Sequence, residues 1–399
     1  MRMRILMLNN EFPPIGGGTG TVNQSVLQHM ARMNGTAKQY EMEIDLITSA
    51  EGKRPSQEIL SDNIRIHRLP VNRWNIHHAS NQELLLYTAR ALGAALKMHL
   101  TKPYDLCMAW SAVHAGGTAL ALRRLTGLRY IIRVCGPDIP GFERRYGALY
   151  PILTPAIREI WHGAQTVVAK CAGEAQMIHA VDPDVAVTLV PNGVDLAAFR
   201  PAQLSAAEGS LRLLCVARLI ERKGQHHLIE AVQRLTEIGM DVILDLIGTG
   251  DAQESLQDQA RNLGVAGRVR FLGYIPRQQI AAHYSTAHIF VLASYSEGMS
   301  VATLEAMASG LPLVITRTGG SAELVSEGIN GLTFSWADID TLTAHLQRLY
   351  MNRPLLHRMG NASRRRAGLF SWENAARSYL DVFEQLTASS LPAKAERVT

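Results

Sequence analysis

The chain has 399 residues, of which 47% are hydrophobic and 19% charged, and its formal net charge is +5. This length predicts two domains, and the apolar content is sufficient to fill two cores. No apolar stretch approaches the roughly 18 residues of a membrane span, and the basic start predicts a first strand rather than a signal peptide. The four cysteines are widely spaced, which argues against a disulfide framework and a zinc site. We therefore expect a soluble, cytoplasmic protein.

The excess of positive charge lies in the first half of the chain. Residues 1–200 hold 21 Lys and Arg against 16 Asp and Glu, whereas residues 201–399 hold 19 of each. A basic half suits an anionic acceptor or a phospholipid surface, but so few charges are more typical of a solvated face. The sequence has no aromatic-interleaved basic stripe and no zinc-finger or RNA-binding signature, so nucleic acid is not expected as a partner.

Apolar, β-branched runs alternate with helical stretches along the chain, which is typical of parallel sheets covered on both faces. Strands are predicted at residues 5–8, 44–48, 64–69, 106–110, 130–134, 166–169 and 185–190, and then at 211–216, 242–247, 269–272, 289–292, 313–316 and 331–334. Helices are predicted at residues 83–100, 113–125, 224–236 and 252–263. The fold class is therefore α/β, with two Rossmann-like domains that face a cleft.

A turn-rich stretch at residues 191–201 marks the boundary between the two domains. We expect an N-terminal domain over residues 1–195 and a C-terminal domain over residues 196–370. A last helix is predicted over residues 371–388, because it follows a serine cap and carries aromatics on one face. Residues 389–399 are predicted to be a disordered tail.

A glycine-rich loop, Phe12-Pro-Pro-Ile-Gly-Gly-Gly-Thr-Gly20, joins the first strand to a helix. Gly17 and Gly18 allow backbone N–H groups to approach a phosphate. The loop is not a dinucleotide fingerprint, because the required third glycine is replaced by Thr21.

The segment from Arg144 to Trp161 combines cations with aromatic and aliphatic residues. Such a segment could contact a lipid-linked acceptor or a membrane surface. The alternative is an amphipathic helix that packs in the core, which is the commoner use of this pattern.

Two cations follow the strand at residues 211–216, where α/β folds bind ligands. Arg218 and Lys223 could neutralise the charge of a departing diphosphate. The alternative is that both are solvated surface cations.

Two carboxylates, Glu297 and Glu305, lie eight residues apart in the most informative run of the chain. Ser300 is placed as the cap of a helix over residues 302–308, which Gly310 and Pro312 would end.

The start of such a helix binds anions, because its N–H groups are unpaired and its dipole is positive there. The backbone of Met299, Ser300 and Val301 could therefore hold a phosphate, and the two carboxylates could accept bonds from hydroxyl groups on either side. A site that contacts hydroxyl groups on both sides of a phosphate is the arrangement expected for a nucleotide sugar. The alternative is a surface helix with two unrelated acids.

This run resembles the Glu-x7-Glu signature of the retaining glycosyltransferases of family 4, which have the GT-B fold. The resemblance implies that Glu297 contacts the hydroxyls of the donor sugar and that Glu305 holds the ribose. It also implies that the backbone of residues 298–301, beginning at Gly298, binds the diphosphate.

The family has further matches along the chain. It has Arg and Lys at the positions of Arg218 and Lys223, a glycine-rich loop near the diphosphate, and a last helix that packs on the first domain. The loops that hold Gly250, Tyr274 and Ile275 would line the nucleotide pocket, although both could be plain strand-to-helix turns.

One position departs from the family pattern. The family commonly reads His-Gly-x-Asp after the strand at residues 130–134, whereas this chain reads Cys135-Gly-Pro-Asp138. Asp138 is retained as a candidate. Because that histidine lies near the donor sugar in the family, Cys135 leaves open which sugar is held.

The resemblance implies retaining, metal-independent transfer of a hexosyl group from a nucleoside diphosphate sugar to a glycan, lipid-linked or small-molecule acceptor, with peripheral membrane contact as one option. No cofactor is expected. The catalytic candidates are Glu297, Asp138, Arg218 and Lys223. The alternatives are a nucleotide-sugar epimerase on the same fold and a non-catalytic protein that binds nucleotide sugars.

Two Asp-x-Asp pairs match a pattern that can bind a metal. Asp182-Pro-Asp184 precedes a strand and Asp338-Ile-Asp340 stands near a helix start. Both pairs are predicted to be turn and capping acids rather than metal ligands.

Overall fold

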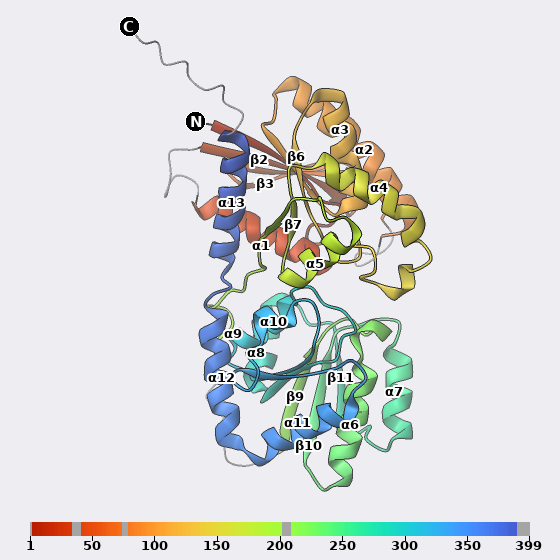
Figure 1. Ribbon diagram of the computed structural model, residues 1–399, viewed down its shortest axis with the longest axis vertical. Helices are drawn as coiled ribbons and strands as arrows, with labels where there is room; N and C mark the ends of the chain where they lie inside the picture. The colour runs from red at the N-terminus through yellow and green to blue at the C-terminus, as the bar shows by residue number, and fades with distance from the viewer. Residues whose placement is uncertain (1, 34–40, 74–78, 202–208, 389–399) are drawn as a thin grey trace. The chain divides into compact units, whose positions relative to one another are not determined.

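The computed structural model describes residues 2–33, 41–73, 79–201 and 209–388. The chain forms two compact units, one of Met1–Pro191 with Trp372–Thr399 and the other of Asn192–Ser371 (Figure 1). The sequence placed the corresponding divisions after residues 195 and 370. Within the second unit, Val194 N donates to Phe370 O at 2.8 Å, so the two chain segments that connect the units are bonded to each other. The tail predicted at residues 389–399 lies outside the described residues.

Unit 1 contains an eight-stranded sheet in the order β3-β4-β2-β1-β5-β6-β7-β8. Its strands are β1 (Arg2–Leu8), β2 (Glu41–Ala50), β3 (Ser56–Ser61), β4 (Ile64–Pro70), β5 (Leu106–Trp110), β6 (Tyr130–Arg133), β7 (Val167–Ala169) and β8 (Val187–Leu189). The pairs are parallel apart from β3 and β4, which are antiparallel. Strand β3 was not predicted from the sequence, because it is an exposed edge strand without an apolar alternation.

The helices of unit 1 cover both faces of its sheet. They are α1 (Gly18–Met33), α2 (Asn81–Thr101), α3 (Gly117–Thr126), α4 (Tyr150–Gly163), α5 (Ala172–Val181) and α13 (Trp372–Ala388), with a π-helical turn η1 (Ala112–Gly116) and a 3-10 turn η2 (Arg144–Tyr146). Helix α13 packs against α1, whereas α3 packs against both α2 and α4 (Figure 1). The buried residues Trp372, Ala376, Tyr379 and Phe383 form the apolar stripe of α13.

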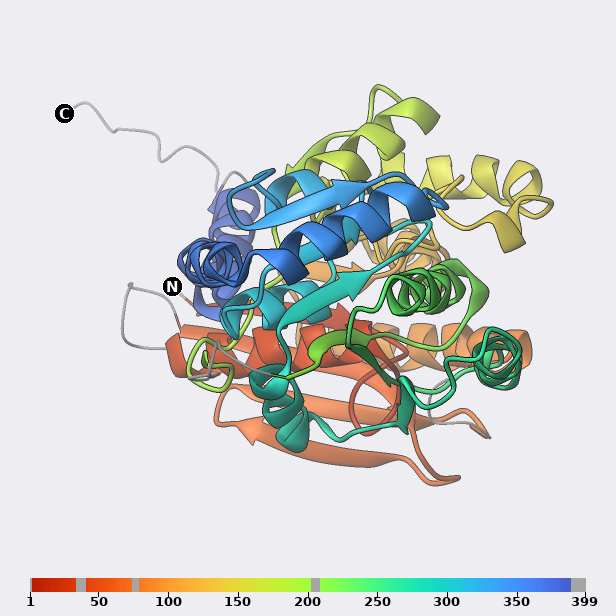
Figure 2. The same ribbon diagram turned by 90° about the horizontal axis from the view of Figure 1, so that it is seen from below.

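Unit 2 contains a six-stranded parallel sheet in the order β11-β10-β9-β12-β13-β14. Its strands are β9 (Leu211–Val216), β10 (Val242–Ile247), β11 (Val269–Gly273), β12 (Ile289–Leu292), β13 (Leu313–Thr316) and β14 (Gly331–Phe334). Its helices are α6 (Gln225–Glu237), α7 (Gln253–Asn262), α8 (Arg277–Thr286), α9 (Val301–Ala308), α10 (Ser321–Leu324), α11 (Ile339–Met351) and α12 (Arg353–Ala367), with a 3-10 turn η3 (Glu221–Lys223). Figure 2 shows helices on both faces of this sheet.

The strand order places two separate loops of unit 2 side by side. The chain builds outward from β9 to β11 and then returns to add β12 on the other side of β9. Ligands of open α/β sheets bind where the strand order reverses in this way. The loop that contains Lys223 follows β9, and the loop that contains Glu297 follows β12.

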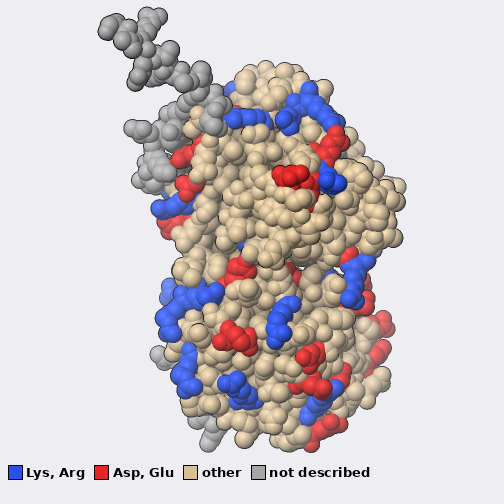
Figure 3. Space-filling model, viewed as in Figure 1, with Lys and Arg blue, Asp and Glu red and all other residues tan. Residues whose placement is uncertain are grey.

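The predicted α/β architecture with two Rossmann-like domains is confirmed. On the face drawn in Figure 3, positive and negative side chains are interspersed, as expected of a solvated surface. None of the helices that the structure describes is both long and apolar enough to cross a membrane.

Candidate active site

The helix predicted after Glu297 is present and capped as expected. Helix α9 begins at Val301, and Thr303 N donates to Ser300 Oγ at 3.3 Å. Asn192 Nδ2 donates to Met299 O at 2.9 Å, which fixes the turn before the helix. Because the first N–H groups of a helix have no intrahelical acceptor, this start offers donors and a positive dipole end to an anion.

Glu297 and Lys223 form an ion pair beside the start of α9. The side chains are only 15% and 13% exposed, and Ser294 Oγ donates to Glu297 Oε1 at 2.7 Å. Burial alone would raise the pKa of Glu297, but the positive charges of Lys223 and Arg222 lower it below its ordinary value. Glu297 is therefore an ionised acceptor.

Backbone contacts hold the β9 and β12 loops together. Arg222 Nη1 donates to Ser296 O at 2.7 Å, and Tyr295 N donates to Arg222 O at 2.8 Å. Gly224 has φ +64°, and a Cβ there would collide with Ala293 O. Only glycine fits at such a close approach of two backbones, which explains why Lys223 reaches Glu297.

A third loop supports Glu297 from the next strand. Gly320 follows β13, its N–H donates to Glu297 O at 3.3 Å, and a Cβ there would collide with Gly298 O. A small cavity of about 10 Å³ lies between these loops and is lined in part by Glu297, Ser300 and Gly320. The sequence reasoning missed Gly320, although the pair Gly319-Gly320 after a strand was an available signal.

Glu305 lies in a different environment from Glu297. Its side chain is 7% exposed, Tyr284 Oη donates to Oε2 at 2.9 Å, and Arg277 Nη1 lies 3.5 Å from Oε1. Burial raises the pKa of Glu305 above its ordinary value, although Arg277 and the bond from Tyr284 act in the opposite direction. Both partners come from α8, and the sequence reasoning missed them because nothing local links α8 to Glu305.

The other donor-site candidates of unit 2 lie on the loops after β9, β10 and β11. Arg218 is exposed, and its carbonyl accepts from Gln225 Nε2 at 2.8 Å. Gly250 has a structural reason to be glycine, since a Cβ there would collide with Leu219 O. Tyr274 is 64% exposed directly after β11, and Ile275 is half-buried.

The glycine-rich loop of unit 1 contains two positions at which the structure itself does not require glycine. Gly17 and Gly18 are exposed, neither has a positive φ, and an added Cβ would meet nothing within 4 Å. Gly16, in contrast, has φ +104° and would collide with Glu11. The open space beside Gly17 and Gly18 would let a ligand approach the backbone closely.

Asp138 connects two loops of unit 1. Its oxygens accept from Ala112 N at 2.8 Å and from Cys135 N at 2.7 Å, which are the loops after β5 and β6. Burial raises its pKa, which these backbone bonds partly offset. This geometry favours a positioning role for Asp138 over direct participation in chemistry. Burial likewise raises the pKa of the Cys135 thiol to about 11.

The two Asp-x-Asp pairs are engaged in local structure. Asp338 caps α11 by accepting from Thr341 N at 3.0 Å. Asp182 accepts from Arg158 Nε at 2.8 Å and lies 2.8 Å from His162 Nε2. Among the described residues, no group of three or more His, Cys, Asp or Glu side chains is arranged to hold a metal ion.

The segment predicted to be amphipathic forms η2 and α4. Its Ile157, Ile160 and Trp161 are buried, whereas Leu149 and Ile152 are 50% and 74% exposed. One face of α4 therefore packs in the core, and two apolar side chains at the start of the helix are exposed to solvent.

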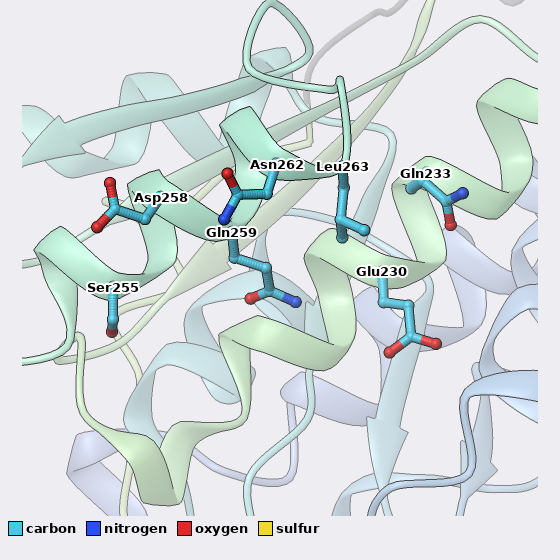
Figure 4. Close-up of a pocket in the computed structure, with 7 residues that line it drawn as sticks. All are labelled: Glu230, Gln233, Ser255, Asp258, Gln259, Asn262 and Leu263. Atoms are coloured by element: carbon cyan, nitrogen blue, oxygen red, sulfur yellow. The ribbon is translucent and has the colours of Figure 1, made fainter.

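A separate hollow of about 490 Å³ lies between α6 and α7 (Figure 4). It is lined mainly by polar side chains, and its Glu230 and Asp258 pair with Arg234 and Arg261. It shares no residue with the predicted donor site.

Two family models match the chain. "Glycosyl transferase 4-like domain" matches residues 17–193 and "Glycosyl transferases group 1" matches residues 198–366. The two matched regions together cover most of both units.

Similar characterised proteins are bacterial sugar transferases. The chain is 27% identical over 386 residues to a GDP-mannose-dependent alpha-(1-6)-phosphatidylinositol monomannoside mannosyltransferase of Mycolicibacterium smegmatis, covering 92% of this chain and 94% of that protein. It is 33% identical over 228 residues to an MMP alpha-(1->4)-mannosyltransferase of Mycolicibacterium hassiacum, covering 56% and 54%.

Solved structures share the fold. A sucrose-phosphate synthase of Thermosynechococcus elongatus superposes with a TM-score of 0.84 at 21% identity, covering 97% of this chain and all of that one. Anabaena HepE in complex with UDP-glucose superposes with a TM-score of 0.74 at 17% identity, covering 96% and 100%. At these identities the likeness concerns the fold alone.

Proposed function

The chain belongs to the group 1 glycosyltransferases, of the family 4 type with a GT-B fold, and we propose that it transfers a hexosyl group from a nucleoside diphosphate sugar with retention of anomeric configuration. GDP-mannose is the first donor to test, because the relative that covers most of this chain is described as dependent on it. The acceptor is a glycan, a lipid-linked sugar or a small molecule.

The observation that carries this proposal is the Glu297–Lys223 pair at the start of α9. An ionised carboxylate can accept hydrogen bonds from sugar hydroxyls. The ammonium group and the free N–H groups of the helix start can hold the adjoining diphosphate. Glu305, on α9 itself, would accept bonds from a ribose. A nucleoside diphosphate sugar has these three parts in this order.

The reaction needs no side-chain base. The bond between the anomeric carbon and the diphosphate oxygen breaks, and the acceptor hydroxyl oxygen bonds to that carbon on the same face. The hydroxyl proton passes to the departing diphosphate oxygen. Lys223, Arg218 and the start of α9 would stabilise the charge that develops there, and preorganised electrostatic stabilisation of this kind often contributes more to catalysis than any other effect. No metal ion enters this scheme.

A panel of nucleoside diphosphate sugars tests the proposal. We expect nucleotide release from one donor, stimulated by an acceptor and unchanged by a chelator, and a product whose anomeric configuration matches that of the donor by NMR. An inverted product would contradict retention, and loss of activity with chelator would contradict metal independence. Release of nucleotide from no donor would contradict the function itself.

A lipid-linked acceptor is supported by exposed apolar side chains at the start of α4. Leu149 and Ile152 are exposed there, and the exposed Arg144 precedes them. Apolar side chains beside a cation are suited to an anionic lipid surface. We expect the protein to float with anionic vesicles, and Ile152→Asp to weaken this binding. Equal flotation of both proteins would contradict the contact.

A further inference from the structure

A buried guanidinium joins the last helix of the chain to the sheet of unit 1. Arg133 is the final residue of β6 and is 2% exposed. Its Nε donates to Tyr379 Oη on α13 at 3.0 Å, across a sequence separation of 246 residues. Tyr379 is itself buried, and its ring lies 6.3 Å from that of Trp110.

The other end of the same guanidinium contacts the loop that follows β6. Arg133 Nη1 lies 3.8 Å from Cys135 Sγ and 3.4 Å from Val134 O. The group also stacks on the Trp110 ring, 4.5 Å from its centroid. Arg133 therefore lies between α13 and the loop from Cys135 to Asp138.

This arrangement couples the two ends of the guanidinium mechanically. Burying a cation is costly unless its donors are satisfied, so Arg133 is strongly held in the position that its partners define. The guanidinium is planar and its donors form a rigid fork, so a shift at Nε also moves Nη1. The Cys135 end of the loop is continuous with Asp138, whose oxygens align the loops after β5 and β6.

We propose that Tyr379 of α13 is a positioning residue for the transfer reaction, acting through Arg133 on the Cys135–Asp138 loop. The last helix is then part of the catalytic machinery and not only a cover for the sheet. This inference rests on the proposed function, because it takes that loop to be part of the active site.

The test is Tyr379→Phe in the full chain, which removes one hydroxyl and keeps the ring. We expect kcat to fall about tenfold, the rate equivalent of roughly one hydrogen bond to a charged group, with the donor KM nearly unchanged. Alkylation of Cys135 by iodoacetamide, followed by mass spectrometry, should accelerate about threefold or more as the loop loosens. Cys135 is the half-buried cysteine, whereas Cys107, Cys171 and Cys215 are buried.

Tyr87→Phe is the matched control. Tyr87 is fully buried in the same unit, and its Oη donates to Ile47 O at 3.0 Å, so the same atom and one hydrogen bond are lost away from the loop. We expect this control to lower the melting temperature without changing kcat or Cys135 alkylation. Equal losses of kcat in both variants would show a merely structural role and overturn the proposal.

Arg133→Lys is a second variant that does not depend on Tyr379→Phe being stable. The lysine keeps a buried positive charge but cannot contact Tyr379 and the Cys135 loop with one rigid fork. This variant should therefore also show a lower kcat and faster alkylation of Cys135. Wild-type kcat and alkylation in Arg133→Lys would overturn the proposal. Failure of the proposed function is separable, because it would abolish donor turnover in the wild type while the alkylation difference between Tyr379→Phe and Tyr87→Phe would persist.

Discussion

The loops at the carboxyl ends of the two sheets are held by different kinds of interaction. In unit 2, the ion pair of Glu297 and Lys223 is nearly buried beside the start of α9. In unit 1, both oxygens of Asp138 accept from backbone amides, and Gly17 and Gly18 leave open space above the backbone. The loops of unit 2 therefore present charged side chains to a ligand, whereas those of unit 1 present backbone that a ligand can approach closely.

The difference indicates how each edge should respond to mutation. Removing one member of the Glu297–Lys223 pair leaves the other nearly buried without its ion-pair partner, which is costly in folding free energy. Adding a methyl group in unit 1 leaves the protein intact but fills the space that a ligand would use. Mutations of the Glu297–Lys223 pair should therefore affect both stability and turnover, whereas suitable mutations in unit 1 should affect turnover alone.

Lys223→Ala should produce the largest loss. We expect kcat/KM for the nucleotide sugar to fall about 10³-fold, because the variant lacks the ammonium group that neutralises the negative charge of the departing diphosphate. Steady-state nucleotide release measures this. Arg234→Ala, which removes a partly exposed cation from α6 in the same unit, should leave kcat/KM near the wild-type value. If the two variants lost activity equally, Lys223 would have no special role.

Glu305→Gln should produce the second largest loss. The amide keeps one acceptor oxygen and has a donor NH2 group in place of the other, so kcat/KM should fall about 10- to 100-fold, as for one or two hydrogen bonds to a charged group. The donor KM should carry most of this change. Glu254→Gln, on the exposed side of α7, is the matched control and should behave as wild type. An unchanged KM in Glu305→Gln would exclude the ribose contact.

The sequence was sufficient where the determining signals were local. The Ser300 cap, the start of α9 and the stop at Gly310 all depend on neighbouring residues, and each is present in the structure. Strands such as β5, β12 and β13 could be predicted because their buried apolar runs are continuous. The edge strand β3 could not, since its exposed residues carry no such pattern.

The parts that the sequence could not supply depend on residues far apart in the chain. Tyr284 and Arg277 reach Glu305 only because α8 packs beside α9. Likewise, nothing near Arg133 identifies Tyr379 as its partner. The motif therefore located the candidate site, but the groups that set the pKa values of its two glutamates required the tertiary structure.

Gly18→Ala tests the open edge of unit 1 and should have a smaller effect on activity. We expect about a tenfold fall in kcat/KM because the methyl group would stand where a phosphate oxygen approaches a backbone N–H. Stability should stay level or rise by up to about 1 kcal/mol, since alanine is favoured over glycine in a helix. Gly93→Ala is the control, because Gly93 is an exposed glycine of α2 with equally open surroundings. Loss of activity in both variants, or in neither, would contradict a ligand at Gly18.

The smallest expected effect is a pH-dependent difference in stability between the two glutamates. The pKa of Glu297 is lowered in the folded state, so its contribution is present above the ordinary value of 4.5 and is lost as the pH falls through the folded pKa. The pKa of Glu305 is raised, so its contribution is present below 4.5 and is lost as the pH rises through the folded pKa.

Replacing each glutamate by glutamine should therefore change the melting temperature in opposite directions with pH. Glu297→Gln should be destabilised relative to wild type mainly at neutral pH and converge with it in acid. The melting temperature of Glu305→Gln relative to that of wild type should be highest at neutral pH, because wild type must ionise a buried carboxyl there. Thermal melts that begin well below pH 4.5 and end at pH 8 measure both differences as shifts of a few degrees, about what 1 kcal/mol produces in domains of this size. Parallel curves for the two variants would mean that Glu305 is stabilised as an anion, in which case Arg277 outweighs burial and the two carboxylates are equivalent charged acceptors.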